Sequence, residues 1–156
     1  MVKTINSSIT DIRESGQVIA HQCNCLTTGR AKGVARQIFE TFPYSDIYYG
    51  RKAPDVPGQI IVRHPGVNQA GPIVVNLLAQ FHPGKPRLDY DTAGDREAWL
   101  LLCFKKMLDS VASSTFYLPF GMGCNLAGGD WSKTIDLAGR VADAAGKEFV
   151  FCLNPK

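Results

Sequence analysis

The sequence lacks any apolar run long enough to span a membrane, and residues 1–4 lack the apolar core of a signal peptide. Its five cysteines form an odd set without the spacing of a disulfide framework. His21, Cys23 and Cys25 share one strand face, but no second Cys/His pair lies at ligand spacing, which argues against zinc. We therefore expect reduced thiols in a cytoplasmic or nuclear compartment, no membrane partner and no metal.

Strong charge and repetition are also missing. The 17 basic and 14 acidic residues leave a net charge of +3, which is too small by itself to indicate a nucleic-acid-binding protein but suits a small polyanionic ligand. No internal repeat or low-complexity segment interrupts the 156 residues. With 45% hydrophobic residues, this length predicts one domain over residues 1–156 with a sizeable core, and we expect a monomer.

Apolar stretches alternate with helical patterns along the chain. Strands are expected over residues 2–9, 17–24, 59–64, 73–79, 115–118 and 147–153. Helices are expected over residues 33–42, 92–110 and 131–145, with a further short one within 44–52. The helix over residues 92–110 should turn Trp99, Leu102, Cys103 and Leu108 inward. This alternation predicts an α/β fold whose sheet is covered on both faces, and such sheets bind ligands beyond the carboxyl ends of their strands.

Residues 120–131 form a loop with four glycines within nine positions. The loop follows an expected strand and precedes an expected helix, so its N–H groups and the helix dipole direct positive potential toward one point. Glycine also lets a ligand approach the main chain closely. The segment is therefore interpreted either as a phosphate-binding loop or as a long glycine turn.

Three segments carry a resemblance that extends over nearly the whole chain. Residues 10–12 (Thr-Asp-Ile) follow the first expected strand, residues 20–25 with 31–35 surround the first glycine-bearing loop, and residues 119–131 form the second. In order and spacing, these segments resemble the macro domain family, which binds ADP-ribose. The likeness is closest to the branch with the yeast ADP-ribose 1''-phosphate phosphatase and the terminal ADP-ribose-glutamate hydrolases. The first loop lacks the triple glycine of the larger hydrolase class.

The resemblance implies a three-layer α/β/α fold with a central mixed, mostly parallel sheet. It also implies that the ligand is ADP-ribose or an ADP-ribosylated macromolecule, with no cofactor. Asp11 would accept the adenine amino group, Asn24 would contact the distal ribose, and the second loop would bind the diphosphate. The positions assigned to ligand binding are Asp11, Ile12, Asn24, Lys32, Gly33, Val34, Gly121, Met122, Gly123, Cys124, Asn125, Leu126 and Ala127.

Three residues are catalytic candidates, and each has a structural alternative. Asn24 would align the distal ribose for attack by water, or it would only hold a turn. His82 would move protons, or it would be a solvated loop residue. Asp130 would act as a base, or it would cap the helix that follows. The same choice applies to Asp11, because aspartate is also common as a turn cap.

The chain departs from the family where glutamate-linked hydrolases carry a catalytic Lys and Asp, since these positions fall near Gln80 and Ala127. A lysine adduct is therefore not expected, and neither Cys25 nor Cys124 has an evident base partner that would make it a nucleophile. The open functions are a hydrolase that removes ADP-ribose from modified targets, or phosphate from ADP-ribose 1''-phosphate, and a non-catalytic ADP-ribose reader. A binder of RNA or poly(ADP-ribose) is the third alternative.

Overall fold

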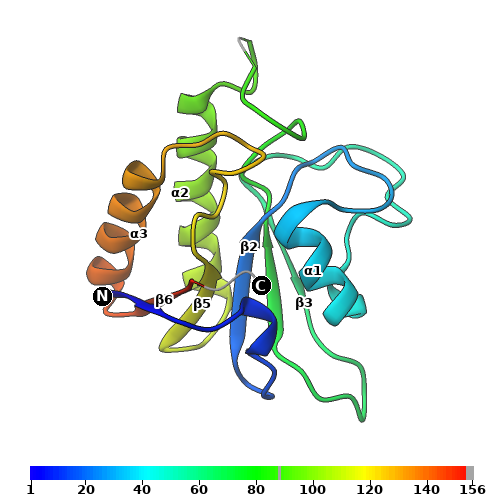
Figure 1. Cartoon of the computed structure of the whole chain (residues 1–156), viewed down its shortest axis with the longest axis vertical. Coiled ribbons are helices and arrows are strands. Elements are labelled where there is room, and N and C mark those ends of the chain that lie inside the picture. Colours follow the sequence, from blue (N-terminus) through cyan, green and yellow to red (C-terminus); the bar gives the residue numbers. More distant parts are fainter. Residues whose placement is uncertain (88, 154–156) are drawn as a thin grey trace.

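The computed structural model of the chain describes residues 1–87 and 89–153 (Figure 1). Within them, six strands form one sheet: β1 (Val2–Ile5), β2 (Val18–Gln22), β3 (Ile60–Arg63), β4 (Ile73–Leu77), β5 (Thr115–Pro119) and β6 (Glu148–Cys152). The helices are α1 (Gly33–Thr41), α2 (Ala93–Ser110) and α3 (Trp131–Ala145), with the short 3₁₀ turns η1 (Ile9–Asp11) and η2 (Pro43–Ser45). No helix in this described part of the chain is both long and apolar enough to cross a membrane.

The strands lie in the order β1-β6-β5-β2-β4-β3, and every neighbouring pair is parallel except β3 with β4. Figure 1 shows α2 and α3 together on one side of the sheet and α1 on the other. Successive strand residues point to opposite faces, so Val18 and Ala20 join the core under α2 and α3, whereas Ile19 joins the core under α1. The predicted α/β fold, with a mixed and mostly parallel sheet between helix layers, is confirmed.

The first strand is shorter than predicted. Instead of extending over residues 2–9, it ends at Ile5. Ser8 then caps η1, because its hydroxyl accepts the N–H of Thr10 while its own N–H donates to the Asp11 carboxylate. These local hydrogen bonds compete with the sheet and bend the chain out of it.

Two further local predictions are wrong. The helix expected within residues 44–52 is reduced to the single turn η2, because the Asp46 carboxylate accepts the N–H of Tyr48 and turns the chain. Leu102, which was expected to face inward from α2, is 47% exposed. Its side chain lies over Gly58 instead, since a Cβ at that glycine would be 3.2 Å from Leu102 Cδ1.

A buried histidine lies in β2 on the side of the sheet that faces α1. His21 is 1% exposed, and its Nε2 donates to Asn76 Oδ1 at 2.7 Å. The direction follows from Asn76, whose Nδ2 donates to the carbonyls of Ser45 and Ile61 and leaves Oδ1 as the acceptor. Burial lowers the pKa of His21 to about 4, although the hydrogen bond with Asn76 opposes this shift. The ring is therefore neutral at pH 7.

The neutral state of His21 predicts a loss of stability in mild acid. An unfolded chain takes up a proton on this histidine near pH 6.5, whereas the folded protein does so only near pH 4. The free energy of unfolding therefore falls as pH drops through this window, by roughly 3 kcal/mol from this group. His21→Gln keeps a donor for Asn76 but does not titrate, so urea denaturation at pH 7 and pH 4 should show a correspondingly smaller loss. Equal pH dependence in both proteins would contradict the buried neutral histidine.

Candidate functional site

A cavity of about 730 Å³ lies beyond the carboxyl ends of β2, β4 and β5. Three loops and the start of α1 surround it: the first loop (residues 24–32), the middle loop (residues 80–87 and 89–91) and the second loop (residues 120–130). Parallel strands end at the same edge of the sheet, so loops far apart in the sequence meet there. The lining residues are His21, Gln22, Asn24, Thr27, Arg30, Ala31, Lys32, Gly33, Val34, Ala35, Gln37, Tyr48, Gln80, Pro83, Gly84, Pro119, Phe120, Gly121, Met122, Gly123, Asn125, Leu126 and Ala127.

Asn24 lies at the start of the first loop and is 7% exposed. Its side-chain Oδ1 accepts the N–H groups of Leu26 at 3.0 Å and Thr27 at 2.8 Å, and its main-chain N–H donates to the Tyr48 hydroxyl. These bonds hold the turn, as one of the two sequence interpretations predicted. They occupy Oδ1 and leave Nδ2, a hydrogen-bond donor, without a partner among the described residues.

Arg51 holds the first loop in place through hydrogen bonds, and its side chain is only 3% exposed. Its Nη1 donates to the Thr27 carbonyl at 3.0 Å, and its Nη2 donates to the Asn24 carbonyl at 3.1 Å. The guanidinium also pairs with Asp55 at 2.8 Å and lies 5.1 Å from the centre of the Tyr48 ring. These contacts make Arg51 the anchor of the loop, a role that the sequence analysis missed.

The second loop leaves several of its main-chain donors unused. Some of its N–H groups bond inside the protein, for example Met122 to the Pro119 carbonyl and Cys124 to the Gly121 carbonyl. Five others form no hydrogen bond to any described residue, and all five belong to residues that line the cavity. These N–H groups are those of Gly121, Gly123, Asn125, Leu126 and Ala127. Clustered N–H donors of this kind bind anions.

Two glutamines connect the floor of the cavity to the middle loop. The register of β2 on β4 pairs Gln22 with Leu77, which brings Gln22 beside Gln80. Gln22 Nε2 donates to Gln80 Oε1 at 2.7 Å, and Gln80 Nε2 donates to the His82 carbonyl at 2.9 Å. The Gln80 amide is therefore hydrogen-bonded through both its oxygen and its nitrogen.

A buried ion pair closes the other side of the middle loop. Arg96, in the first turn of α2, donates from Nε and Nη2 to the two carboxylate oxygens of Asp91, each at 2.8 Å. Burial by itself raises the pKa of the Asp91 carboxyl, but hydrogen bonds from Arg96 and from the His82 and Phe81 amides hold this pKa below its usual range. Asp91 is therefore charged at neutral pH and serves the loop as an anchor.

The charged residues of the cavity lining are basic. Arg30 and Lys32 belong to the lining, and none of the described lining residues is acidic. Arg30 also pairs with Glu40 at 3.3 Å on the surface of α1. A cavity with two cations, several unused N–H groups and no carboxylate attracts anions.

The thiols near the cavity are poor nucleophiles. Burial raises the pKa of Cys25 to about 12 and also raises the pKa of Cys124, so both are protonated at neutral pH. The Cys23 sulfur lies against His21 and Asn76. Across residues 1–87 and 89–153, no group of three His, Cys, Asp or Glu side chains is placed to hold a metal ion.

The cavity brings together most of the ligand-binding positions expected from the sequence. Asn24, Lys32, Gly33 and Val34 line it from the first loop and α1. Gly121, Met122, Gly123, Asn125, Leu126 and Ala127 line it from the second loop. Cys124 does not, because its side chain turns back so that the thiol donates to the Met122 carbonyl.

Asp11 and Ile12 lie outside the lining. Asp11 is exposed in η1, where its carboxylate accepts the N–H of Ser8, and Ile12 is buried in the core under α1. The contact of Asp11 with Ser8 therefore agrees with the interpretation of Asp11 as a turn cap. Its role toward adenine stays a prediction.

The other two catalytic candidates, Asp130 and His82, also lie outside the lining. The predicted helix cap at Asp130 is confirmed, because its carboxylate accepts the N–H and the hydroxyl of Ser132. The hydroxyl contact lowers the pKa of the Asp130 carboxyl, which makes it a weaker base. The ring of His82 packs against those of Phe81 and Tyr90, at 5.1 and 5.4 Å between ring centres, and the next residue, Pro83, lines the cavity.

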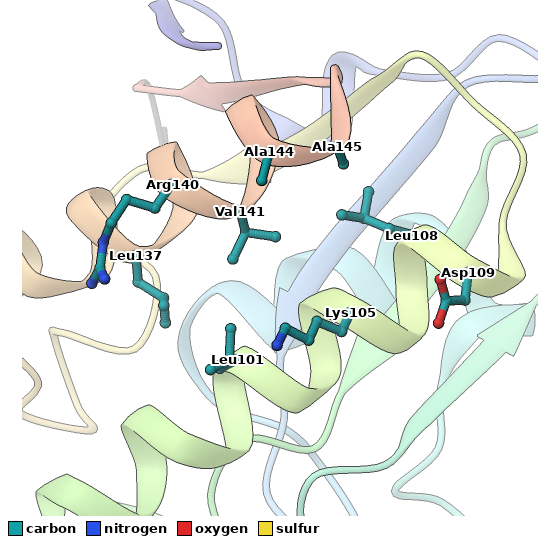
Figure 2. Close-up of a pocket in the computed structure, with 9 residues that line it drawn as sticks. All are labelled: Leu101, Lys105, Leu108, Asp109, Leu137, Arg140, Val141, Ala144 and Ala145. Carbon is teal, nitrogen blue, oxygen red and sulfur yellow. The ribbon is translucent and has the colours of Figure 1, made fainter.

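A second, smaller hollow of about 470 Å³ lies between α2 and α3 (Figure 2). Leu101 and Leu108 of α2 face Leu137 and Val141 of α3 across it, with charged side chains at its edges. It has no loop with unused main-chain donors and lies on the helix layer, away from the carboxyl ends of the strands. The larger cavity is therefore the candidate site.

Comparison with known proteins identifies the fold. Neither a protein-family model nor a curated protein matches the sequence. Among solved structures, the chain is similar to the macrodomain of Mycobacterium tuberculosis DarG, at 14% identity and a TM-score of 0.74 over 99% of both chains. It is also similar to the macrodomain of Thermus aquaticus DarG, at 18% identity and a TM-score of 0.71 over 99% of both chains. A mutant macrodomain from Oceanobacillus iheyensis gives 12% identity and a TM-score of 0.57, over 98% of this chain and 85% of the other. The protein has the macrodomain fold.

Two glycines of the second loop provide a matched test of its packing. Gly121 and Gly123 have almost equal φ angles, +76° and +77°, but a Cβ at Gly121 meets nothing within 4 Å, whereas one at Gly123 would lie 2.7 Å from Gln22 Oε1. Gly121→Ala should lower the free energy of unfolding by about 1–2 kcal/mol through backbone strain. Gly123→Ala should cost about 1 kcal/mol more, because Gln22 must leave its bond to Gln80.

Urea denaturation of the two variants measures this difference. In a Gln22→Ala background the colliding amide is absent, so adding Gly123→Ala to Gln22→Ala should cost about as much as Gly121→Ala costs in the wild type. Equal losses in the two single variants would show that Gln22 does not pack under the loop.

Proposed function

We propose that the cavity binds the ADP-ribose moiety, either free or attached to a macromolecule. The observation that carries this proposal is the set of five second-loop N–H groups that no described residue accepts. A diphosphate presents several acceptor oxygens and negative charge to one point, which is what such a cluster binds. The cations Arg30 and Lys32 in the lining add to the attraction.

The two ends of ADP-ribose would be recognised by different chemistry. Asn24 offers the distal ribose a fixed donor, because its Oδ1 is held by the loop. Asp11 offers the adenine amino group a carboxylate acceptor. Its turn η1 packs beside α1 and β5, two of the elements from which the cavity walls extend.

A reducing compartment, cytoplasmic or nuclear, fits this function. All five cysteines are free thiols, and only Cys124 is more than slightly exposed. An oxidising compartment would favour disulfide use of such residues.

Hydrolysis of an ADP-ribose linkage, or of ADP-ribose 1''-phosphate, is the second candidate function. The fixed donor of Asn24 favours it, because such a group aligns a ribose for attack by water. Gln80 replaces the adduct-forming lysine, so the reaction would proceed by direct water attack. The proton would go to His82 at the edge of the cavity, to Asp130, or to the phosphate of the substrate itself.

Free ADP-ribose should bind the wild-type protein with one-to-one stoichiometry, and AMP should bind more weakly because it lacks the second phosphate and the distal ribose. Asp11→Ala should weaken ADP-ribose binding by about 1.5–3 kcal/mol, the value of a charge-assisted hydrogen bond. Isothermal titration calorimetry measures both. Inosine diphosphate ribose lacks the adenine amino group and should bind the wild type poorly. Equal affinity for both ligands would refute the role of Asp11, and no ADP-ribose binding at millimolar concentration would refute the function.

Asn24 distinguishes hydrolysis from recognition. In a hydrolase, Asn24→Ala should lower turnover by several powers of ten but change ADP-ribose affinity by only about 0.5–1.5 kcal/mol. Turnover is measured as release of ADP-ribose or phosphate from ester-linked, arginine-linked, serine-linked and 1''-phosphorylated substrates. Asn24→Asp is the control for the loop, because it keeps the oxygen that binds Leu26 and Thr27.

Three outcomes separate the alternatives. A loss of turnover that exceeds the loss of affinity in both Asn24 variants supports catalysis. Equal losses of rate and affinity would make Asn24 a uniform binding contact. No turnover of any substrate by the wild type leaves recognition as the function.

A further inference from the structure

The guanidinium of Arg96 forms several hydrogen bonds in addition to its ion pair with Asp91. The side chain is 8% exposed in the first turn of α2. Besides the two bonds to Asp91, it donates to four main-chain carbonyls, those of His82, Gly84, Lys85 and Ala127, at 2.8–3.3 Å. A buried arginine satisfies its donors in this way only where the chain folds around it.

The four carbonyls belong to two different loops. His82, Gly84 and Lys85 lie in the middle loop, and Ala127 lies at the end of the second loop. A single nitrogen, Nη1, donates to both Gly84 at 2.8 Å and Ala127 at 3.3 Å, and both of these residues line the cavity. One atom therefore joins two walls of the candidate site.

The two loops also pack together beside this junction. A Cβ at Gly128 would lie 3.0 Å from Lys85 Cγ, so Gly128 of the second loop packs closely against the Lys85 side chain of the middle loop. The Gly128 N–H donates to the Asn125 carbonyl and closes the turn that presents the unused donors of Asn125, Leu126 and Ala127. The Ala127 carbonyl shares its peptide plane with this N–H, and Arg96 holds that carbonyl.

We propose that Arg96 is a positioning residue that sets the spacing of the middle and second loops, and that this spacing determines how tightly the cavity holds the diphosphate. The inference rests on the proposed ADP-ribose binding. It adds that Arg96, a residue outside the cavity lining, controls the affinity for that ligand. Asp91 fixes the guanidinium in one orientation, and the planar fork reaches acceptors in several directions at once. A lysine ammonium cannot reproduce that geometry.

Arg96→Lys is the test, because it keeps the charge that balances buried Asp91. In isothermal titration calorimetry, the variant should bind ADP-ribose at unchanged stoichiometry with a dissociation constant raised about tenfold or more. Unchanged stoichiometry shows that the protein is folded, so the loss belongs to the site. Arg140→Lys is the matched control, since Arg140 is exposed and, within the described part of the chain, its one ion pair is with Asp136 of its own helix. It should bind as the wild type does.

A second readout does not depend on the ligand. Amide hydrogen exchange of Arg96→Lys should rise at hydrogen-bonded amides of both loops together, those of His82 in the middle loop and of Met122, Cys124 and Gly128 in the second loop, while the sheet stays protected. If Arg96→Lys is unstable, the neutral pair Asp91→Asn with Arg96→Gln avoids an unbalanced buried charge and should show the same two effects.

The outcomes are distinguishable from those of the proposed function. If the wild type binds ADP-ribose and Arg96→Lys binds equally well with unchanged exchange, the positioning role is overturned. Exchange that rises in only one of the loops also overturns it. If the wild type does not bind ADP-ribose, the proposed function fails, and the exchange of the two loops then decides whether Arg96 couples them.

Discussion

Two buried arginines hold the main chain of the loops at the carboxyl edge of the sheet. Arg51 donates to carbonyls of the first loop, and Arg96 donates to carbonyls of the middle and second loops. Each has an aspartate partner, Asp55 or Asp91, that balances its charge. Irregular loops have no ladder to satisfy their carbonyls, and a buried carbonyl without a donor is costly. The guanidinium groups supply those donors and thereby give the cavity walls a defined shape.

When the carbonyls of a loop accept hydrogen bonds from arginine side chains, N–H groups of the same loop are left without an acceptor. Where Arg96 and internal turn bonds occupy the acceptors of the second loop, five of its donors are left over beside the cavity. Asn24 follows the same pattern, since the loop takes its oxygen and leaves its nitrogen. An excess of donors, together with the cations of the lining, is the chemistry that suits an anionic, acceptor-rich ligand.

The sequence predicted the fold class and the elements well, because alternation and helical period report burial directly. It also predicted the Asp130 cap and the two loops that meet at the cavity. It failed where partners are main-chain atoms of distant segments: no residue spacing indicates that Arg51 and Arg96 hold loop carbonyls. The Gln22–Gln80 pair was missed because it depends on the register of β2 against β4. The short helix expected after residue 44 failed because one carboxylate, that of Asp46, outweighed weak helical propensity.

A site whose ligand contacts come largely from the main chain encodes its specificity in torsion angles more than in side-chain identity. Side chains at Asn125, Leu126 and Ala127 can change while the N–H groups remain, whereas the positive φ values of Gly121, Gly123 and Gly128 restrict what can stand there. Most of the second loop is therefore free to drift in sequence at little cost to the donor array. Over long divergence, such a loop keeps its shape and its glycine positions and loses nearly everything else that a sequence comparison could detect.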